Sequence, residues 1–267
     1  MKQILKIISI FILASCQTLG FNQEDPNGPV KLDLNYESFM SESWLNKAET
    51  PLINFNFFGE NIESEMFFDI NGTTVFSVND NQLSLINYDS GEVQKSYELE
   101  TSRIISGVSV GYNTFLYTDA DGVIYAHESG SGDLKWTKAL EDVVLSEILI
   151  TSTNVYVQTS SDVLYGLNLQ NGETQWSKKA QAPLLSIRGT ASPVAFEGLI
   201  FTSFSNGRLA AVREVDGIQL WEKPISRLKG STELEKLMDA DSKAVPINED
   251  VFVANYNGSL TRFNIRG

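Results

Sequence analysis

Five short runs of β-branched and aromatic residues recur along the chain, and a two-residue turn signal begins within three residues of the end of each run. The runs are VFSV (75–78), FLYT (115–118), VYVQ (155–158), IFTS (200–203) and VFVAN (251–255). The pairs that follow them are Asp80-Asn81, Asp121-Gly122, Ser161-Asp162, Asn206-Gly207 and Asn257-Gly258. Because such pairs accept the backbone angles of tight hairpins, each run predicts a β-strand that turns directly into the next one.

These hairpins belong to a repeat of forty-odd residues that carries a glycine and, four residues later, a tryptophan. The repeat glycines are Gly91, Gly132, Gly172, Gly217 and Gly267, spaced 41, 40, 45 and 50 residues apart. Tryptophan follows at Trp136, Trp176 and Trp221, whereas the first repeat has Lys95 in that place. Further turn signals, Asn71-Gly72 and Glu197-Gly198, precede the strand runs, so each repeat should hold about four antiparallel strands.

A four-stranded sheet cannot bury both of its faces alone, so neighbouring repeats must stack. Radial stacking of such units makes a β-propeller, and we predict an all-β fold of four-stranded antiparallel blades, about four to five of them in this chain. A β-sandwich and a linear β-solenoid are the alternatives. Trp44, in Trp-Leu-Asn-Lys-Ala, resembles the outer strand at Trp176 and predicts a strand that closes the last blade.

The repeats also predict how the chain is divided. Complete blades should end near residues 99, 140, 180 and 225, and a partial blade should occupy 244–267. Because the blade that Trp44 would complete is absent, we expect a C-terminally shortened propeller over residues 36–267. An open ring of this kind exposes strand edges, which favour aggregation.

The first residues have the pattern of an export signal. Two lysines precede the apolar stretch Ile7–Leu13, which is too short to span a bilayer but has the size of a signal-peptide core. The stretch ends in Leu-Ala-Ser-Cys, which resembles a bacterial lipobox. We predict a signal peptide over residues 1–15, a lipid on Cys16 and a lipidated tether over 16–35. An ordinary secretory signal or a buried N-terminal helix is the alternative. Gln17, by resemblance to sorted lipoproteins, favours the outer membrane.

Composition excludes several classes of function. The chain has 34 acidic and 20 basic residues and a net charge of −14, which argues against nucleic acid as a partner because phosphate binding needs clustered Lys and Arg. A single cysteine, Cys16, excludes a disulfide framework and Cys-based metal sites, and a single histidine, His127, excludes multi-His metal sites.

Four segments, together with the lipobox and the Gly-x-x-x-Trp repeats, resemble the family of outer-membrane protein assembly factor BamB. They are PLLSIRG (183–189), NGRLAAV (206–212), LKGSTELEKLMDADS (228–242) and VFVANYNGSLT (251–261). The resemblance implies an eight-bladed propeller, anchored by lipid to the periplasmic face of the outer membrane. It further implies a non-enzymatic subunit of the β-barrel assembly machinery (BAM complex) that docks on the periplasmic POTRA domains of BamA and uses no cofactor.

The resemblance also implies which residues bind the partner. They fall on two loops: Leu185, Ile187 and Arg188 on the first, and Asp239 and Asp241 on the second. The repeat spacing supports these loops independently, because both lie between a tryptophan strand and the next repeat, where the spacing grows to 45 and then 50 residues. Equivalent connections of consecutive blades emerge on one face of a propeller, so both loops should form one patch. The alternative is that their apolar residues pack beneath the blade and their acids are merely solvated.

Catalytic and metal-binding interpretations have weaker support. His127 aligns with aliphatic or aromatic residues in the other repeats, namely Ile86, Leu167, Val212 and Phe263, so we expect a packed, hydrogen-bonded histidine. Asp119 and Asp121 faintly resemble a calcium loop but lack its further acidic ligands, so a hairpin turn is the better interpretation. The rival class is a quinone-dependent (PQQ-type) dehydrogenase, whose cofactor typically lies beside adjacent cysteines. A different periplasmic propeller that binds another partner is the third possibility.

Overall fold

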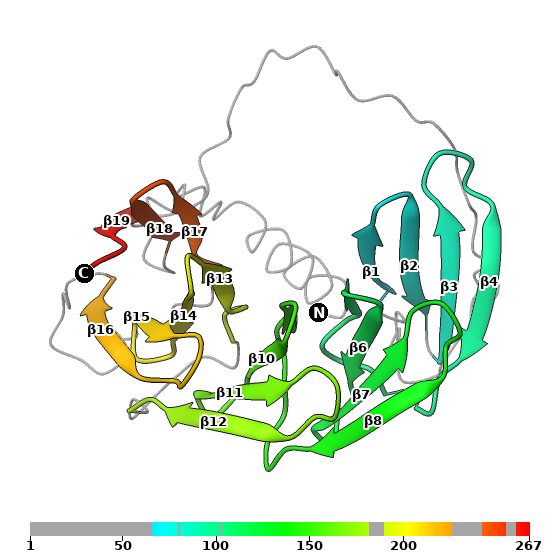
Figure 1. Ribbon diagram of the computed structural model, residues 1–267, viewed down its shortest axis with the longest axis horizontal. Coiled ribbons are helices and arrows are strands. Elements are labelled where there is room, and N and C mark those ends of the chain that lie inside the picture. Colours follow the sequence, from blue (N-terminus) through cyan, green and yellow to red (C-terminus); the bar gives the residue numbers. More distant parts are fainter. Residues whose placement is uncertain (1–65, 80, 102, 182–189, 226–241, 255–259) are drawn as a thin grey trace, which may run out of the picture. The chain divides into compact units, whose positions relative to one another are not determined.

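The computed structural model describes residues 66–79, 81–101, 103–181, 190–225, 242–254 and 260–267. Within these ranges the strands form five separate antiparallel sheets, each built from consecutive strands (Figure 1). The predicted signal peptide, the lipidated Cys16, the tether and the closing strand at Trp44 lie outside the described residues.

The sheets follow one another along the chain. Sheet 1 contains β1 (Met66–Asn71), β2 (Thr74–Asn79), β3 (Gln82–Asn87) and β4 (Val93–Glu98). Sheet 2 contains β5 (Ser109–Gly111), β6 (Thr114–Thr118), β7 (Val123–Glu128) and β8 (Leu134–Ala139). Sheet 3 contains β9 (Leu149–Ile150), β10 (Asn154–Gln158), β11 (Val163–Asn168) and β12 (Thr174–Lys179). Sheet 4 contains β13 (Val194–Phe196), β14 (Leu199–Phe204), β15 (Arg208–Arg213) and β16 (Gln219–Pro224), and sheet 5 contains β17 (Val245–Ile247), β18 (Asp250–Ala254) and β19 (Leu260–Asn264).

Four sheets have four strands each, and the fifth has three among the described residues. Separate sheets of this kind, one per repeat and stacked on their neighbours, are the blades of a β-propeller and not the two layers of a sandwich or the coils of a solenoid. The predicted all-β propeller of four-stranded blades is therefore confirmed.

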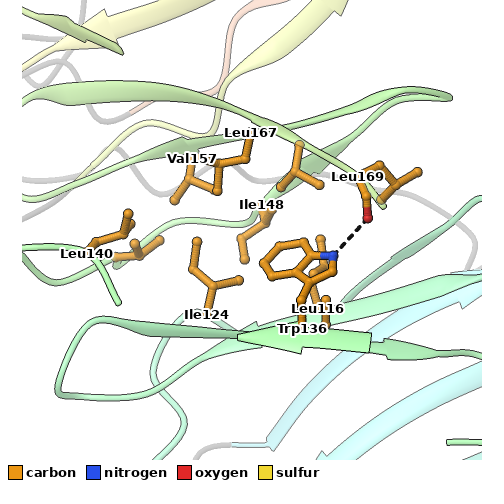
Figure 2. Packing of buried hydrophobic residues seen from close by; sticks show 11 residues of the cluster. Leu116, Ile124, Trp136, Leu140, Ile148, Val157, Leu167 and Leu169 are labelled. Carbon is orange, nitrogen blue, oxygen red and sulfur yellow. Dashed lines mark hydrogen bonds between the residues drawn. The ribbon is translucent and has the colours of Figure 1, made fainter. Parts of the chain in front are cut away.

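The tryptophan of sheets 2, 3 and 4 packs against the repeat glycine of the sheet that follows, and this contact joins consecutive blades. A Cβ atom on Gly172 would lie 2.6 Å from the ring of Trp136, so only glycine leaves room for the indole. The ring N–H of Trp136 donates to the carbonyl of Leu169 at 2.9 Å, as Figure 2 shows. The same contact recurs between Trp176 and Gly217 and between Trp221 and Gly267, and those indoles donate to the carbonyls of Glu214 and Ile265.

The first of these seams departs from the pattern, as Lys95 in the tryptophan position predicts. Tyr97, two residues further along β4, takes the place against Gly132, where a Cβ atom would lie 2.4 Å from the phenol ring. The ammonium of Lys95 and the hydroxyl of Tyr97 both donate to the carbonyl of Gly130, at 2.8 and 3.1 Å. Two side chains thus replace one indole with the same result, a hydrogen-bonded contact to the turn of the next sheet.

Apolar clusters fill the seams between neighbouring sheets. Between sheets 2 and 3 the cluster includes Leu116 and Ile124 from one sheet and Val157 and Leu167 from the other, with Trp136 at its edge (Figure 2). Three further clusters of the described residues join sheets 1 and 2, 3 and 4, and 4 and 5. A sheet therefore buries apolar side chains against its neighbours along the chain, and a single repeat would lack this packing.

Candidate interaction face

The predicted partner-binding residues Leu185, Ile187, Arg188, Asp239 and Asp241 lie outside the described residues. They belong to two chain segments, 182–189 and 226–241. The structure describes the residues on either side of both segments, and these fix where each segment leaves the propeller and where it returns.

All four connections between sheets begin at the same end of the sheets. Because neighbouring strands run in opposite directions, the connection after the fourth strand lies at the same end as the turn between the second and third strands. We call this the connection end. The backbone N–H that follows each fourth strand donates to a carbonyl in that turn: Leu99 to Asn81 (2.7 Å), Leu140 to Gly122 (2.9 Å), Ala180 to Asp162 (2.9 Å) and Ile225 to Gly207 (2.9 Å).

Each of the first three connections is also tied to the corresponding turn of the sheet that follows. The backbone pairs are Ala120 N–H with the Arg103 carbonyl (2.9 Å) and Ser160 N–H with the Val143 carbonyl (2.8 Å). In the third connection a side chain replaces the backbone N–H: the amide of Asn206 donates to the Gln181 carbonyl at 3.1 Å. A connection therefore bridges two turns, and neighbouring turns hold one another in place.

The ends of the second segment have further anchors. Thr261 donates through its hydroxyl to the carbonyl of Ile225 at 2.6 Å, and the hydroxyl of Ser242 donates to the carbonyl of Ala254. Lys243 forms an ion pair with Glu147 at 2.8 Å, which links the connection that enters sheet 5 to the one that enters sheet 3. Both side chains of this pair are more than half exposed, so the pair contributes little stability but fixes the direction of Lys243.

Asp142 lies at the connection end and holds the turn of sheet 3 through its carboxylate. Its carboxylate accepts hydrogen bonds from the Ser160 hydroxyl at 2.8 Å and from the Ser161 N–H at 2.6 Å. Partial burial raises the pKa of Asp142, but the hydrogen bonds from the two serines and the backbone outweigh burial and hold the pKa below its usual value. The group is therefore an ionised structural anchor of the β10–β11 turn.

A cavity of about 330 Å³ lies beside the first strands of the sheets, and its lining includes Asp69, Ser109, Glu147, Pro193 and Lys243. The side chains of Asp69, Ser109, Glu147 and Lys243 already have partners within the protein. The two oxygens of Asp69 accept the N–H groups of Ile70 (2.8 Å) and Val110 (2.7 Å), and the Ser109 hydroxyl accepts the N–H of Ile148 at 3.1 Å. These side chains cap the free edges of β5 and β9, a use of polar groups that protects strand edges from pairing with other chains.

His127 is buried in the seam between sheets 1 and 2, as expected of a packed histidine. Its ring stacks on Phe115 with centroids 4.8 Å apart, and its Nδ1 lies 3.0 Å from the Gly132 carbonyl. Its Nε2 faces the carboxylate of Glu100 at 3.2 Å and the hydroxyl of Tyr117 at 3.3 Å. Burial, followed by the hydrogen bond and charge of Glu100, raises the pKa of Tyr117, so the phenol keeps its proton and donates to that carboxylate.

The Asp119 turn is a hairpin, as expected from the sequence. One carboxylate oxygen of Asp119 accepts the N–H groups of Asp121 and Val123, each at 3.0 Å, and the other accepts the Tyr125 hydroxyl at 3.0 Å. Across the described ranges, no group of three or more His, Cys, Asp or Glu residues is placed to hold a metal ion. Within the same ranges, no helix has the length and apolar character needed to cross a bilayer.

Comparison with known proteins adds the decisive observation. The family model of outer membrane protein assembly factor BamB matches residues 79–267, which is most of the chain. The chain belongs to the BamB family. The match includes all four inter-sheet connections and both segments that hold the predicted partner-binding residues.

Individual BamB proteins are similar to this chain over part of their length. BamB of Yersinia pestis is 30% identical over 166 residues, which are 62% of this chain and 42% of that protein. BamB of Escherichia coli (strain K12) is 30% identical over 170 residues, 64% of this chain and 43% of that protein. The chain thus spans less than half the length of these two relatives. The crystal structure of BamB from Moraxella catarrhalis matches with a TM-score of 0.67 and 24% identity, covering 74% of this chain and 60% of that one, and this likeness shows the fold.

Proposed function

We propose that this protein is a non-enzymatic lipoprotein scaffold of the β-barrel assembly machinery. It binds the periplasmic POTRA domains of BamA and aids the folding and insertion of outer-membrane β-barrel proteins. A lipid on Cys16 holds it at the periplasmic face of the outer membrane, and it needs neither a cofactor nor a nucleic acid. Membership of the BamB family and the lipobox before Cys16 support this proposal.

One structural observation carries the proposal. The β14–β15 turn holds the residues from which both candidate segments depart: Asn206 binds the Gln181 carbonyl, and the Gly207 carbonyl binds the Ile225 N–H. The two segments therefore leave the propeller from neighbouring points at the connection end. This supports a single partner-binding patch made of Leu185, Ile187 and Arg188 with Asp239 and Asp241.

The composition of the two segments suits a protein partner. Leu185 and Ile187 are apolar anchors beside Arg188, a combination that dominates binding energy in many interfaces. Asp239 and Asp241 suit a basic partner residue, because carboxylates form charge-assisted hydrogen bonds with Arg and Lys. The rival PQQ-type dehydrogenase typically has a pair of adjacent cysteines at its cofactor, whereas these 267 residues contain Cys16 alone.

The proposal is tested by measuring the affinity of the full chain for purified POTRA domains by isothermal titration calorimetry. We expect the double variant Arg188→Ala, Asp239→Ala to bind at least about 10-fold more weakly, because interface anchors of this kind carry most of the binding energy. The control is Arg213→Ala, Asp216→Ala, which removes an exposed Arg–Asp ion pair from the β15–β16 turn at the opposite end of sheet 4.

The control should bind like the unmodified chain. Full affinity of the Arg188, Asp239 variant would contradict the assignment of these residues. Reduction of a redox dye on addition of the quinone and calcium would contradict the non-enzymatic role and support the rival class.

A further inference from the structure

Asp162 occupies a backbone position that the neighbouring sheets give to glycine. It ends the β10–β11 turn with φ of 59°, and the residues that end the equivalent turns of sheets 2 and 4 are Gly122 (φ 78°) and Gly207 (φ 72°). All three use their carbonyl in the same way, to accept the N–H that follows the fourth strand. Aspartate adopts such a φ less readily than glycine, so the contacts of its side chain are what distinguish this turn from its neighbours.

The side chain of Asp162 links sheet 3 to sheet 4. It is only 3% exposed, and its carboxylate accepts both the N–H of Ser205, at 3.1 Å, and the hydroxyl of Ser205. Ser205 lies in the β14–β15 turn, so this contact crosses the seam between the two sheets. Hydrogen bonds to a buried carboxylate are about twice as strong as those between neutral groups, which offsets the strain of the backbone.

A buried polar cluster continues this link into the seam. The side-chain amide of Gln158, on β10, donates to the Ser203 carbonyl at 2.9 Å, and the Thr202 hydroxyl donates to the side-chain oxygen of Gln158. These residues of β10 and β14 are all buried. At the connection end, hydrogen bonds therefore fix how sheet 3 is aligned with sheet 4, whereas apolar packing alone would let the two sheets shift against one another.

The residues held by this link are those from which both candidate segments depart. Asp162 binds Ala180 through its carbonyl and Ser205 through its side chain. The two residues after Ser205 are Asn206 and Gly207, which hold Gln181 and Ile225. Asp162 thus holds the β14–β15 turn in place relative to the end of β12. Through Asn206 and Gly207, the β14–β15 turn then holds the residues from which both segments start.

We propose that Asp162 is a positioning residue for partner binding, which sets the distance between the starting points of segments 182–189 and 226–241. This inference rests on the proposed function and extends it from the contact residues to the framework that holds them. A partner that contacts both segments at once gains affinity only when their separation matches its own surface, because pre-organisation removes the cost of ordering.

The test uses Asp162→Gly, which removes the carboxylate and relieves the strained backbone. Spin labels are attached to cysteines introduced at Gln181 and Lys223, two exposed residues just before the two segments, in a chain that also carries Cys16→Ser. We expect the distribution of label-to-label distances, measured by pulsed electron paramagnetic resonance, to broaden clearly. Without labels, we expect the affinity for POTRA domains to fall about 10-fold, because binding must then order the two starting points that Asp162 holds in place in the unmodified chain.

Two further variants separate positioning from general stability. Asp162→Asn keeps an oxygen that accepts the Ser205 N–H and tolerates the left-handed backbone, so it should restore most of the narrow distance distribution and of the affinity. Asp121→Gly removes an exposed carboxylate from the turn of sheet 2 and should leave both measurements unchanged. All variants are compared by thermal unfolding, and Asp162→Gly should melt close to the unmodified chain.

The outcomes are distinct. An unchanged distance distribution in Asp162→Gly would overturn the inference, whatever the affinity. A broadened distribution with unchanged affinity would also overturn it, because the framework would then be irrelevant to binding. If the unmodified chain itself fails to bind POTRA domains, the proposed function is wrong, while the distance measurement still decides whether Asp162 holds the two starting points together.

Discussion

At the scale of single residues, the propeller depends on positions where a side chain and a backbone must share one space. Gly172 is the clearest case, because its φ is 70° and the ring of Trp136 lies where its Cβ atom would be. Gly198, in the β13–β14 turn, has a similar φ of 75°, but a Cβ atom there would have no neighbour within 4 Å. A comparison of substitutions at these two glycines therefore distinguishes the cost of backbone strain, which both share, from the cost of a steric clash, which only Gly172 has.

We therefore expect Gly172→Ala to destabilise the chain by about 2 kcal/mol or more beyond Gly198→Ala, because overpacking against a buried ring adds to the backbone cost. Gly198→Ala alone should cost about 1 kcal/mol, the cost of a left-handed alanine. Urea unfolding of both variants measures the difference. Equal losses would show that the ring of Trp136 moves aside freely and that the contact does not constrain the seam.

The spacing of glycine and tryptophan residues in the sequence predicted much of the fold, but it did not predict every side-chain contact between sheets. The Gly-x-x-x-Trp pattern predicted the blades, and the departure at Lys95 was visible in the sequence. The sequence did not reveal that Tyr97 takes the place of the missing tryptophan, because the contact of Tyr97 with Gly132 in the next sheet leaves no local sequence pattern. Asp162 had one signal, an acidic residue where the equivalent turns of sheets 2 and 4 have glycine, but its partner Ser205 is 43 residues away. Glu100, which reaches His127 from a connection, had none.

At the scale of elements, a connection is held by the turns on either side of it. Asp142 belongs to the connection between sheets 2 and 3, and its carboxylate holds Ser160 and Ser161 in the β10–β11 turn. Because the pKa of Asp142 is lowered in the folded chain, the unfolded chain binds the proton more readily. The contribution of this group to stability is therefore complete above the unfolded pKa and is lost as pH falls through the lower folded pKa.

The predicted consequence is a pH-dependent difference between the unmodified chain and Asp142→Asn. The unmodified chain should be more stable at pH 6.5, and its advantage should shrink as pH falls below 3.8, the usual value for this group. Urea unfolding at pH 6.5 and pH 3 measures both chains. Asp121→Asn, in an exposed turn, is the matched control. A difference that stays constant with pH would refute the anchoring role of the Asp142 carboxylate.

Element topology also explains how far the candidate site was predictable. The growth in repeat spacing placed both segments in connections, and the strand order locates their starting points at the connection end. The contact residues themselves, Arg188 and Asp239 among them, were assigned by resemblance to a family and remain predictions. The hydrogen bonds that tie Gln181 and Ile225 to one turn could not be read from the sequence, since they join residues of different repeats.

At the scale of the whole molecule, sheets 1 and 5, the first and last sheets among the described residues, have exposed apolar side chains. On sheet 1, Phe67 packs towards sheet 2, whereas the alternating residues Phe68 and Ile70 point to the opposite face and are 67% and 48% exposed. On sheet 5, Val245 and Ile247 of β17 are similarly about half exposed. Apolar sheet faces of this kind favour association with other chains.

We expect the 267-residue chain with Cys16→Ser, which removes the lipid site, to self-associate as its concentration rises. The double variant Phe68→Ser, Val245→Ser should shift the equilibrium towards monomer, because it removes apolar surface from both faces. Val215→Ser, at an exposed position in the β15–β16 turn, is the control for loss of an exposed apolar residue elsewhere. Sedimentation velocity measures the association. A monomeric unmodified chain would contradict the expectation.

The tryptophan–glycine contact has a consequence for how such chains change in evolution. Sheets 2, 3 and 4 each present an indole to the sheet that follows and a bare glycine to the sheet that precedes, and one repeat encodes both residues. Duplicating an internal stretch of about forty residues would therefore insert a copy that already matches both neighbours, and deleting one would leave two ends that still fit. Propellers of this type can gain or lose blades in single genetic steps without new compensating substitutions at the joints.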